Sequence, residues 1–154
     1  MSKTEAVLLS LTSLGTSARA SSILQRNPKV NGPKHALDYE KESSCWNSDG
    51  VKSGETPKPL HFIVDFGRSV RATQIRIQFQ AGFVAEEVAI EYQTESGWQT
   101  AMEEEELEDT HEMQTIDLES EVVCRAIKLN LDEFKDFYGR VTVYQLQVWG
   151  HEAE

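Results

Sequence analysis

Apolar and polar residues alternate strictly in several short runs of this 154-residue chain. Ile75, Ile77 and Phe79 alternate with glutamine and arginine, which predicts a β-strand with one buried face. Similar runs lie at residues 62–66, 88–92, 116–118 and 127–131. No apolar repeat is long enough for a helix of more than two turns. Short strands separated by many turns predict an all-β fold, an antiparallel β-sandwich of the jelly-roll kind.

The last predicted strand changes its phase. Val141 and Val143 fall on odd positions, whereas Tyr144, Leu146 and Val148 fall on even ones. A slip of one residue turns every following side chain to the opposite face of a sheet. The pattern therefore predicts a β-bulge near Val143 and Tyr144, where one extra residue restores the apolar face.

The length suits a single domain, which we expect over residues 15–150, with a short tail at 151–154. No linker long enough to divide domains is present. Residues 1–14 are the hardest to assign, and we expect a mobile segment or a short helix there. The apolar stretch at 6–14 is interrupted by hydroxyl residues, so neither a membrane span nor a signal peptide is expected.

The chain carries a formal net charge of −11, from 26 acidic and 15 basic residues. Such a surface repels a nucleic-acid backbone, so direct nucleic-acid binding is not expected. Glutamate and aspartate are concentrated at residues 103–109. We expect a solvated acidic loop there; the alternative is a docking patch for a basic partner.

The two cysteines, Cys45 and Cys124, lie far apart in the sequence. A disulfide between them is one possibility, but two free thiols fit better, and they indicate the reducing environment of the nucleus or the cytoplasm. Cys45 with His35 could be imagined as a nucleophile and its base, yet no glycine-rich elbow surrounds them. The four histidines show no metal-binding spacing. We therefore expect no enzyme activity.

Several segments resemble one known family in order and spacing. An aspartate-bearing loop at residues 36–38 leads to the segment 43–46, which ends in Trp46. A strand at 62–67 ends in Asp-Phe-Gly. A strand, turn and tryptophan follow at 88–98, and a closing strand at 144–150 ends in an aromatic residue and glycine. Over residues 19–150 the chain resembles the discoidin domain (coagulation factor 5/8 type C, galactose-binding-like).

A narrower resemblance rests on residues 22–27, 45–49, 77–83 and 136–141. These segments are similar to small intracellular discoidin proteins that associate with an orphan nuclear receptor. The resemblance implies a nuclear interaction module that represses receptor-driven transcription by hindering DNA binding. Two alternatives remain open: a lectin-like domain that binds a carbohydrate or another small ligand, and a scaffold subunit of an intracellular complex.

In the discoidin fold three loops of this chain are expected to approach one another at one rim. Aromatic faces there would supply contact area, and an arginine would supply several donors. These residues also have structural interpretations, with Trp46 and Phe83 as core side chains. Arg140 would then pair with Asp136, Asp49 or a loop carbonyl. The candidate binding residues are Trp46, Asn47, Gln80, Phe83, Phe137, Tyr138 and Arg140.

Many discoidin relatives hold calcium through the aspartate loop and a late glutamate. The corresponding late position here is Gln145, a poorer ligand for a hard cation. Asp38 and Glu42 remain as secondary calcium candidates, and no other cofactor is expected.

Overall fold

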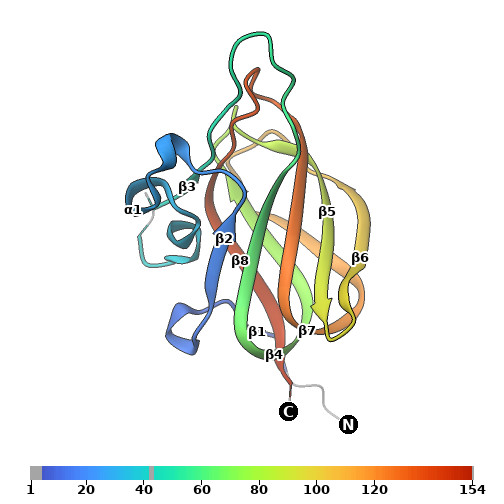
Figure 1. The fold of residues 1–154 in the computed structure, drawn as a ribbon. Coiled ribbons are helices and arrows are strands. Elements are labelled where there is room, and N and C mark those ends of the chain that lie inside the picture. The colour runs from blue at the N-terminus through green and yellow to red at the C-terminus, as the bar shows by residue number, and fades with distance from the viewer. Residues whose placement is uncertain (1–4, 42–43, 154) are drawn as a thin grey trace.

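The structure, a computed structural model, describes residues 5–41 and 44–153. Strands form most of it, and the helices are short (Figure 1). The helical elements are η1 (Thr12–Leu14), η2 (Leu24–Arg26), α1 (Pro28–Asn31) and η3 (Pro33–Leu37). The strands are β1 (Val7–Leu8), β2 (Ser17–Ala20), β3 (Trp46–Asn47), β4 (Leu60–Phe79), β5 (Ala85–Thr94), β6 (Gly97–Glu106), β7 (Gln114–Phe134) and β8 (Thr142–Glu152).

Strands β4 and β7 belong to both layers of the fold. The first part of β4 pairs with β7 from Leu60 to Asp65, and the second part pairs with β7 and β8 from Val70 onward. The register shifts between Asp65 and Val70, where Gly67 has a φ of 69°. The hydrogen-bonded sheet therefore bends over on itself. The predicted antiparallel β-sandwich is confirmed.

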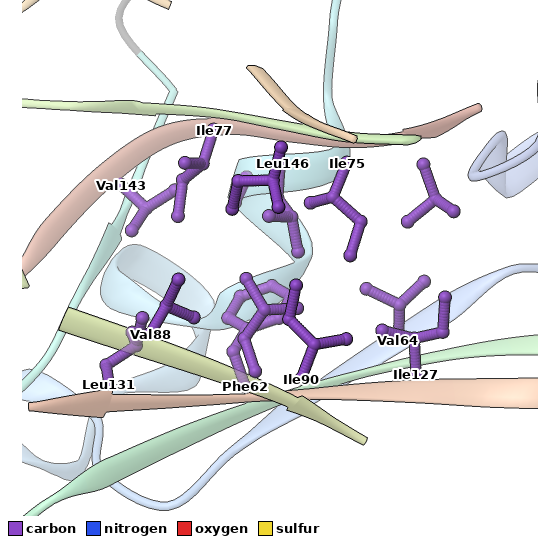
Figure 2. Packing of buried hydrophobic residues seen from close by; sticks show 14 of the residues in the cluster. Phe62, Val64, Ile75, Ile77, Val88, Ile90, Ile127, Leu131, Val143 and Leu146 are labelled. Atoms are coloured by element: carbon purple, nitrogen blue, oxygen red, sulfur yellow. The ribbon is translucent and has the colours of Figure 1, made fainter. Parts of the chain in front are cut away.

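The core lies between the two layers. Burial of each large aliphatic side chain stabilises the fold by about 1.5–3 kcal/mol. Figure 2 shows side chains from the second part of β4 and from β8 facing side chains from the first part of β4, from β5 and from β7. Ile75, Ile77, Val143 and Leu146 lie on one side, and Phe62, Val64, Val88, Ile90, Ile127 and Leu131 lie on the other.

The predicted bulge in the last strand is confirmed. Gln78 pairs with Gln145, whereas the next residue, Phe79, pairs with Val143. Tyr144 is thus the extra residue, and Val143 and Leu146 both reach the core. The change of phase in the sequence has this bulge as its cause.

Both ends of the described chain belong to the sheet. Val7 pairs with Gly150 in β8, and Leu9 is fully buried. At the other end, Glu152 pairs with Val70. The sheet therefore extends beyond the expected range of 15–150 in both directions. Within the described residues, no helix is long and apolar enough to cross a membrane.

The expectation of an acidic loop at residues 103–109 was wrong for its first half. Residues 103–106 continue β6, with Glu105 opposite Val88 and Glu106 opposite Glu87 on β5. Only residues 107–109 lie outside the strand. Backbone pairing with β5 decides the conformation of residues 103–106. Exposed glutamates are tolerated on this edge strand, where their charge protects it from pairing with other chains.

The two cysteines are free thiols, as expected. Cys124 lies in the core, but Cys45 is only half-buried.

Candidate binding rim

Two of the three candidate loops are tied together by backbone hydrogen bonds. The Ser48 N–H donates to the carbonyl oxygen of Val141 at 2.9 Å, and the Val141 N–H donates to the Ser48 hydroxyl at 2.8 Å. Further out, the Val51 N–H donates to the carbonyl oxygen of Tyr138 at 2.9 Å. The loop after β3 therefore lies along the loop before β8.

The third loop, between β4 and β5, joins them through Thr142. The Gln80 N–H donates to the carbonyl oxygen of Thr142 at 2.9 Å, and the Thr142 N–H donates to that of Phe83 at 3.0 Å. The three loops thus meet at one end of the sandwich, away from both termini (Figure 1). We call the surface formed by Gln80, Phe83, Phe137, Tyr138 and Arg140 the rim.

The most exposed part of the rim is a small aromatic cluster. The Phe137 side chain is 79% exposed, and its ring meets that of Tyr138 edge-on with 5.2 Å between centroids. The Arg140 guanidinium lies 5.6 Å from the centre of the Tyr138 ring. Two apolar faces and a cation therefore project together into solvent, an arrangement typical of interaction surfaces.

A tight turn presents this cluster. One carboxylate oxygen of Asp136 accepts the N–H groups of Tyr138 at 3.1 Å and of Arg140 at 3.0 Å. Gly139 has a φ of 77°, a conformation that glycine adopts without strain. Asp136 therefore binds the backbone of Arg140, whereas one of the alternatives from the sequence paired it with the Arg140 side chain.

Two of the predicted contact residues are structural instead. Trp46 is fully buried against Phe62, and its Nε1–H donates to the carbonyl oxygen of Ser22 at 2.9 Å. The Asn47 amide is occupied on both sides, because it donates to Asn31 Oδ1 at 3.0 Å and accepts from the Thr142 hydroxyl at 2.8 Å. Trp46 is therefore a core side chain, as its structural interpretation predicted, and Asn47 fixes the conformation of the loop.

An acidic surface adjoins the rim. The Asp109 carboxylate accepts the N–H of Gly82, in the rim loop, at 2.7 Å. Seven carboxylates line a shallow hollow of about 640 Å³ beside it, and we call them the acidic patch: Glu86, Glu87, Glu104, Glu106, Glu108, Asp109 and Glu133.

The carboxylates of the acidic patch interact with one another. A hydrogen bond with Glu104 is the main cause that raises the pKa of Glu87. Sequence reasoning found only the members at 103–109. Glu86, Glu87 and Glu133 come from β5 and β7, and only the pairing of these strands brings them beside β6.

The comparisons with known proteins agree with this architecture. The F5/8 type C domain family matches residues 17–148. This chain belongs to that family. The F5/8 type C domain described here is 34% identical over 139 residues to Nuclear receptor 2C2-associated protein of Mus musculus, covering 90% of this chain and 93% of the relative. It is 32% identical over 139 residues to the Homo sapiens protein of that name, covering 90% and 94%.

Solved structures show the same fold at much lower identity. One is a family 32 carbohydrate-binding module of C. perfringens NanJ in complex with galactose, with a TM-score of 0.75, 16% identity, and coverage of 94% of this chain and 99% of that one. Another is the C-terminal domain of a chitobiase from Bacteroides fragilis, with a TM-score of 0.76, 20% identity, and coverage of 96% and 100%. The galactose-binding-like jelly-roll fold is therefore shown.

Of the two calcium candidates of this F5/8 type C domain, the structure describes Asp38. The Asp38 carboxylate accepts the Glu40 N–H at 3.3 Å and lies 4.0 Å from the Lys41 ammonium. Glu42 lies outside the described residues. Gln145 accepts a hydrogen bond from Gln147 at 2.8 Å. Across residues 5–41 and 44–153, no group of three or more histidine, cysteine, aspartate or glutamate side chains could hold a metal ion.

The hypothetical pair of Cys45 and His35 is also occupied elsewhere. The Cys45 sulfur accepts a hydrogen bond from the Asn47 amide at 3.5 Å, and burial raises the pKa of this thiol. His35 Nε2 lies 2.8 Å from the carbonyl oxygen of Lys29. Both side chains are thus bonded to other groups, and a raised pKa disfavours the thiolate that a cysteine nucleophile requires.

Proposed function

We propose that this F5/8 type C domain is a non-enzymatic interaction module that binds a nuclear receptor in the nucleus or the cytoplasm. The observation that carries the proposal is the contact between the rim and the acidic patch, through the Gly82–Asp109 hydrogen bond. One end of the molecule thereby combines projecting aromatic side chains with a dense negative charge. The names of the Mus musculus and Homo sapiens relatives support a receptor as partner.

The negative charge of the acidic patch suggests which surface of a receptor this domain would contact. A surface that binds DNA carries lysine and arginine to contact phosphates. The acidic patch complements such a surface, and the aromatic pair of Phe137 and Tyr138 would anchor the contact beside it. We propose that binding there hinders the receptor from binding DNA and so represses transcription.

Binding to purified full-length mouse nuclear receptor 2C2, measured by surface plasmon resonance, tests this proposal. The triple variant Phe137→Ala/Tyr138→Ala/Arg140→Ala removes the rim cluster and should weaken binding by about 100-fold or more, since interface anchors often contribute at least 2 kcal/mol each. Val123→Ala is the matched control, because Val123 is exposed but lies outside the rim. Unchanged affinity of the triple variant would contradict the rim as the binding surface.

The acidic patch is tested separately by Glu86→Gln/Glu106→Gln, with Glu95→Gln/Glu119→Gln as a control of equal charge change. The first pair should weaken binding and reduce its dependence on salt, whereas the second should not. A gel-shift assay with receptor and its DNA then tests repression. A ternary complex with undiminished DNA binding would contradict the repressor mechanism and leave receptor binding intact.

A carbohydrate ligand is the second candidate, because the NanJ module of the same fold is in complex with galactose. Two observations at this end of the molecule disfavour a carbohydrate ligand. Phe137 projects instead of lining a hollow, and the Asn47 amide is already bonded to Asn31 and Thr142. Titration with galactose, followed by the amide signals of Tyr138 and Arg140, separates the two functions.

A further inference from the structure

Strand β2 is an edge strand, and η3 (Pro33–Leu37) packs near it without forming a backbone hydrogen bond to its outer side. The inner side of β2 pairs with β4, with Arg19 opposite Ile63, and the Ser21 N–H continues this pairing to the carbonyl oxygen of His61 at 3.0 Å. Backbone groups of alternate residues point to opposite sides of a strand, so those of Ala18 and Ala20 face outward. Within the described part of the chain, no loop or helix donates or accepts a hydrogen bond at this outer side.

A groove runs along this outer edge. It lies between β2 and the segment that holds α1, on the side of the sheet away from β5 and β6 (Figure 1), and encloses about 510 Å³. That volume is in the range of sites that bind small ligands or short peptides. Its apolar lining comes from Ala18, Ala20, Ile23, Pro28 and Pro33. Pro28 and Pro33 lack an N–H group, so neither residue can donate a backbone hydrogen bond to the outer carbonyl oxygens of β2.

The rest of the lining is basic. Arg19, Lys29 and Lys34 border the groove of a protein whose net charge is −11. Arg19 makes one long, exposed ion pair, 3.7 Å from Asp65, and neither lysine takes part in an ion pair with a described residue. The groove therefore has the opposite charge to the acidic patch beside the rim.

We propose that this groove binds an extended acidic peptide of a partner protein, which adds as a strand to the outer edge of β2. The peptide backbone pairs with Ala18 and Ala20, its apolar side chains lie against Ile23 and the prolines, and its carboxylates face Arg19 and the two lysines. Strand addition of this kind combines affinity from backbone hydrogen bonds with specificity from alternate side chains. This surface is separate from the rim, and its test does not depend on receptor binding.

The probe is a capped, fluorescein-labelled octapeptide of alternating glutamate and valine, titrated into the full chain by fluorescence anisotropy. A lysine–valine octapeptide and a glutamate–valine octapeptide with N-methyl groups on alternate residues are the peptide controls. We expect the first peptide to bind and both controls to fail. Lys29→Glu/Lys34→Glu should weaken binding by about tenfold or more, while Arg125→Glu/Lys135→Glu, the same charge change elsewhere, should not.

Amide hydrogen exchange on the wild-type protein gives a second readout that needs no variant. Exchange at Ala18 and Ala20 should be fast in the free protein and slow with peptide, whereas Arg19 and Ser21 are protected in both states. No binding at about 1 mM peptide, or equal binding of the lysine–valine peptide, would overturn the proposal. So would protection of Ala18 and Ala20 that rises with protein concentration alone, because a second copy would then cover the edge.

Discussion

The guanidinium of Arg68 forms two parallel hydrogen bonds with the carboxylate of Glu152, from Nε to Oε1 at 2.7 Å and from Nη2 to Oε2 at 2.6 Å. The same side chain donates to the carbonyl oxygens of Leu9 at 3.0 Å and Phe66 at 3.1 Å. Arg68 therefore joins the N-terminal segment, the bend of β4 and the end of β8. Both ends of the described chain are held at this one side chain.

Replacing Arg68 should cost more stability than replacing its partner. Arg68→Ala removes the donor to the Phe66 carbonyl oxygen and leaves that of Leu9 with only the longer bond from the Thr16 hydroxyl, at 3.4 Å. It should lower the free energy of unfolding by about 1–2 kcal/mol. Glu152→Gln should cost about 1 kcal/mol or less, because the Glu152 side chain is 48% exposed and solvent screens the pair. Urea denaturation measures both values, and an equal loss for the two variants would contradict the assigned role of Arg68.

The same pair predicts a pH dependence. The hydrogen bond from Arg68 lowers the pKa of Glu152 from its ordinary value of 4.5, so the unfolded chain takes up this proton at a higher pH than the folded chain. The contribution to stability is complete above pH 4.5 and is lost as the pH falls through the folded pKa. Thermal unfolding of Glu152→Gln should show a smaller loss of stability in this acidic range than the wild type.

Gly150→Ala should be strongly destabilising. A methyl group at this position would overlap the carbonyl oxygen of Arg71 on the neighbouring strand, where backbone cannot move away without breaking the ladder. We expect a loss of about 2–3 kcal/mol, typical of overpacking. Gly54→Ala is the control, because its surroundings are open and only its φ of 87° costs about 1 kcal/mol. Similar losses in denaturant unfolding would rule out the clash.

Trp46, below the rim, and Phe137, in the rim, should differ greatly in how much stability their truncation costs. Trp46→Ala removes a fully buried ring and its hydrogen bond to Ser22, and should cost about 3–5 kcal/mol. Phe137→Ala should change the free energy of unfolding by no more than about 0.5 kcal/mol, since this ring is exposed. Chemical denaturation of the two variants checks both values. A large loss for Phe137→Ala would show that the ring supports the fold.

Neutralising one member of the acidic patch should stabilise the protein near neutral pH. The pKa of Glu87 is raised, mainly by its bond to Glu104, so the folded state holds this proton more tightly than the unfolded state. Stability from this group is therefore present at acidic pH and is lost as the pH rises through the folded pKa. Glu104→Gln should raise the melting temperature at pH 7, and Glu119→Gln, an exposed glutamate outside the patch, should not.

Local patterns in the sequence predicted the fold well. The change of phase at Tyr144 indicated a bulge because side-chain alternation is a property of a single strand. The loops of Ser48, Phe83 and Tyr138 were expected to meet because of the family resemblance. Trp46 and Asn47 show the limit of this reasoning. Residue type alone does not show whether a tryptophan or an asparagine near a loop faces solvent or is bonded inside.

Features that depend on non-local pairing were missed. The partners Arg68 and Glu152 are 84 positions apart, and no periodicity connects them. The strand conformation of residues 103–106 was missed because glutamate rarely favours a strand, and only pairing with β5 overrides that preference. The groove beside β2 depends equally on where the segment around α1 returns to the sheet.

Because β4 and β7 run through both layers, the sandwich has no seam along which one layer could separate from the other. Opening either layer requires breaking the ladder between these two strands, and that ladder also supports the opposite layer. Amide hydrogens on both sides of the bend at Gly67 should therefore exchange together, in a single cooperative unit.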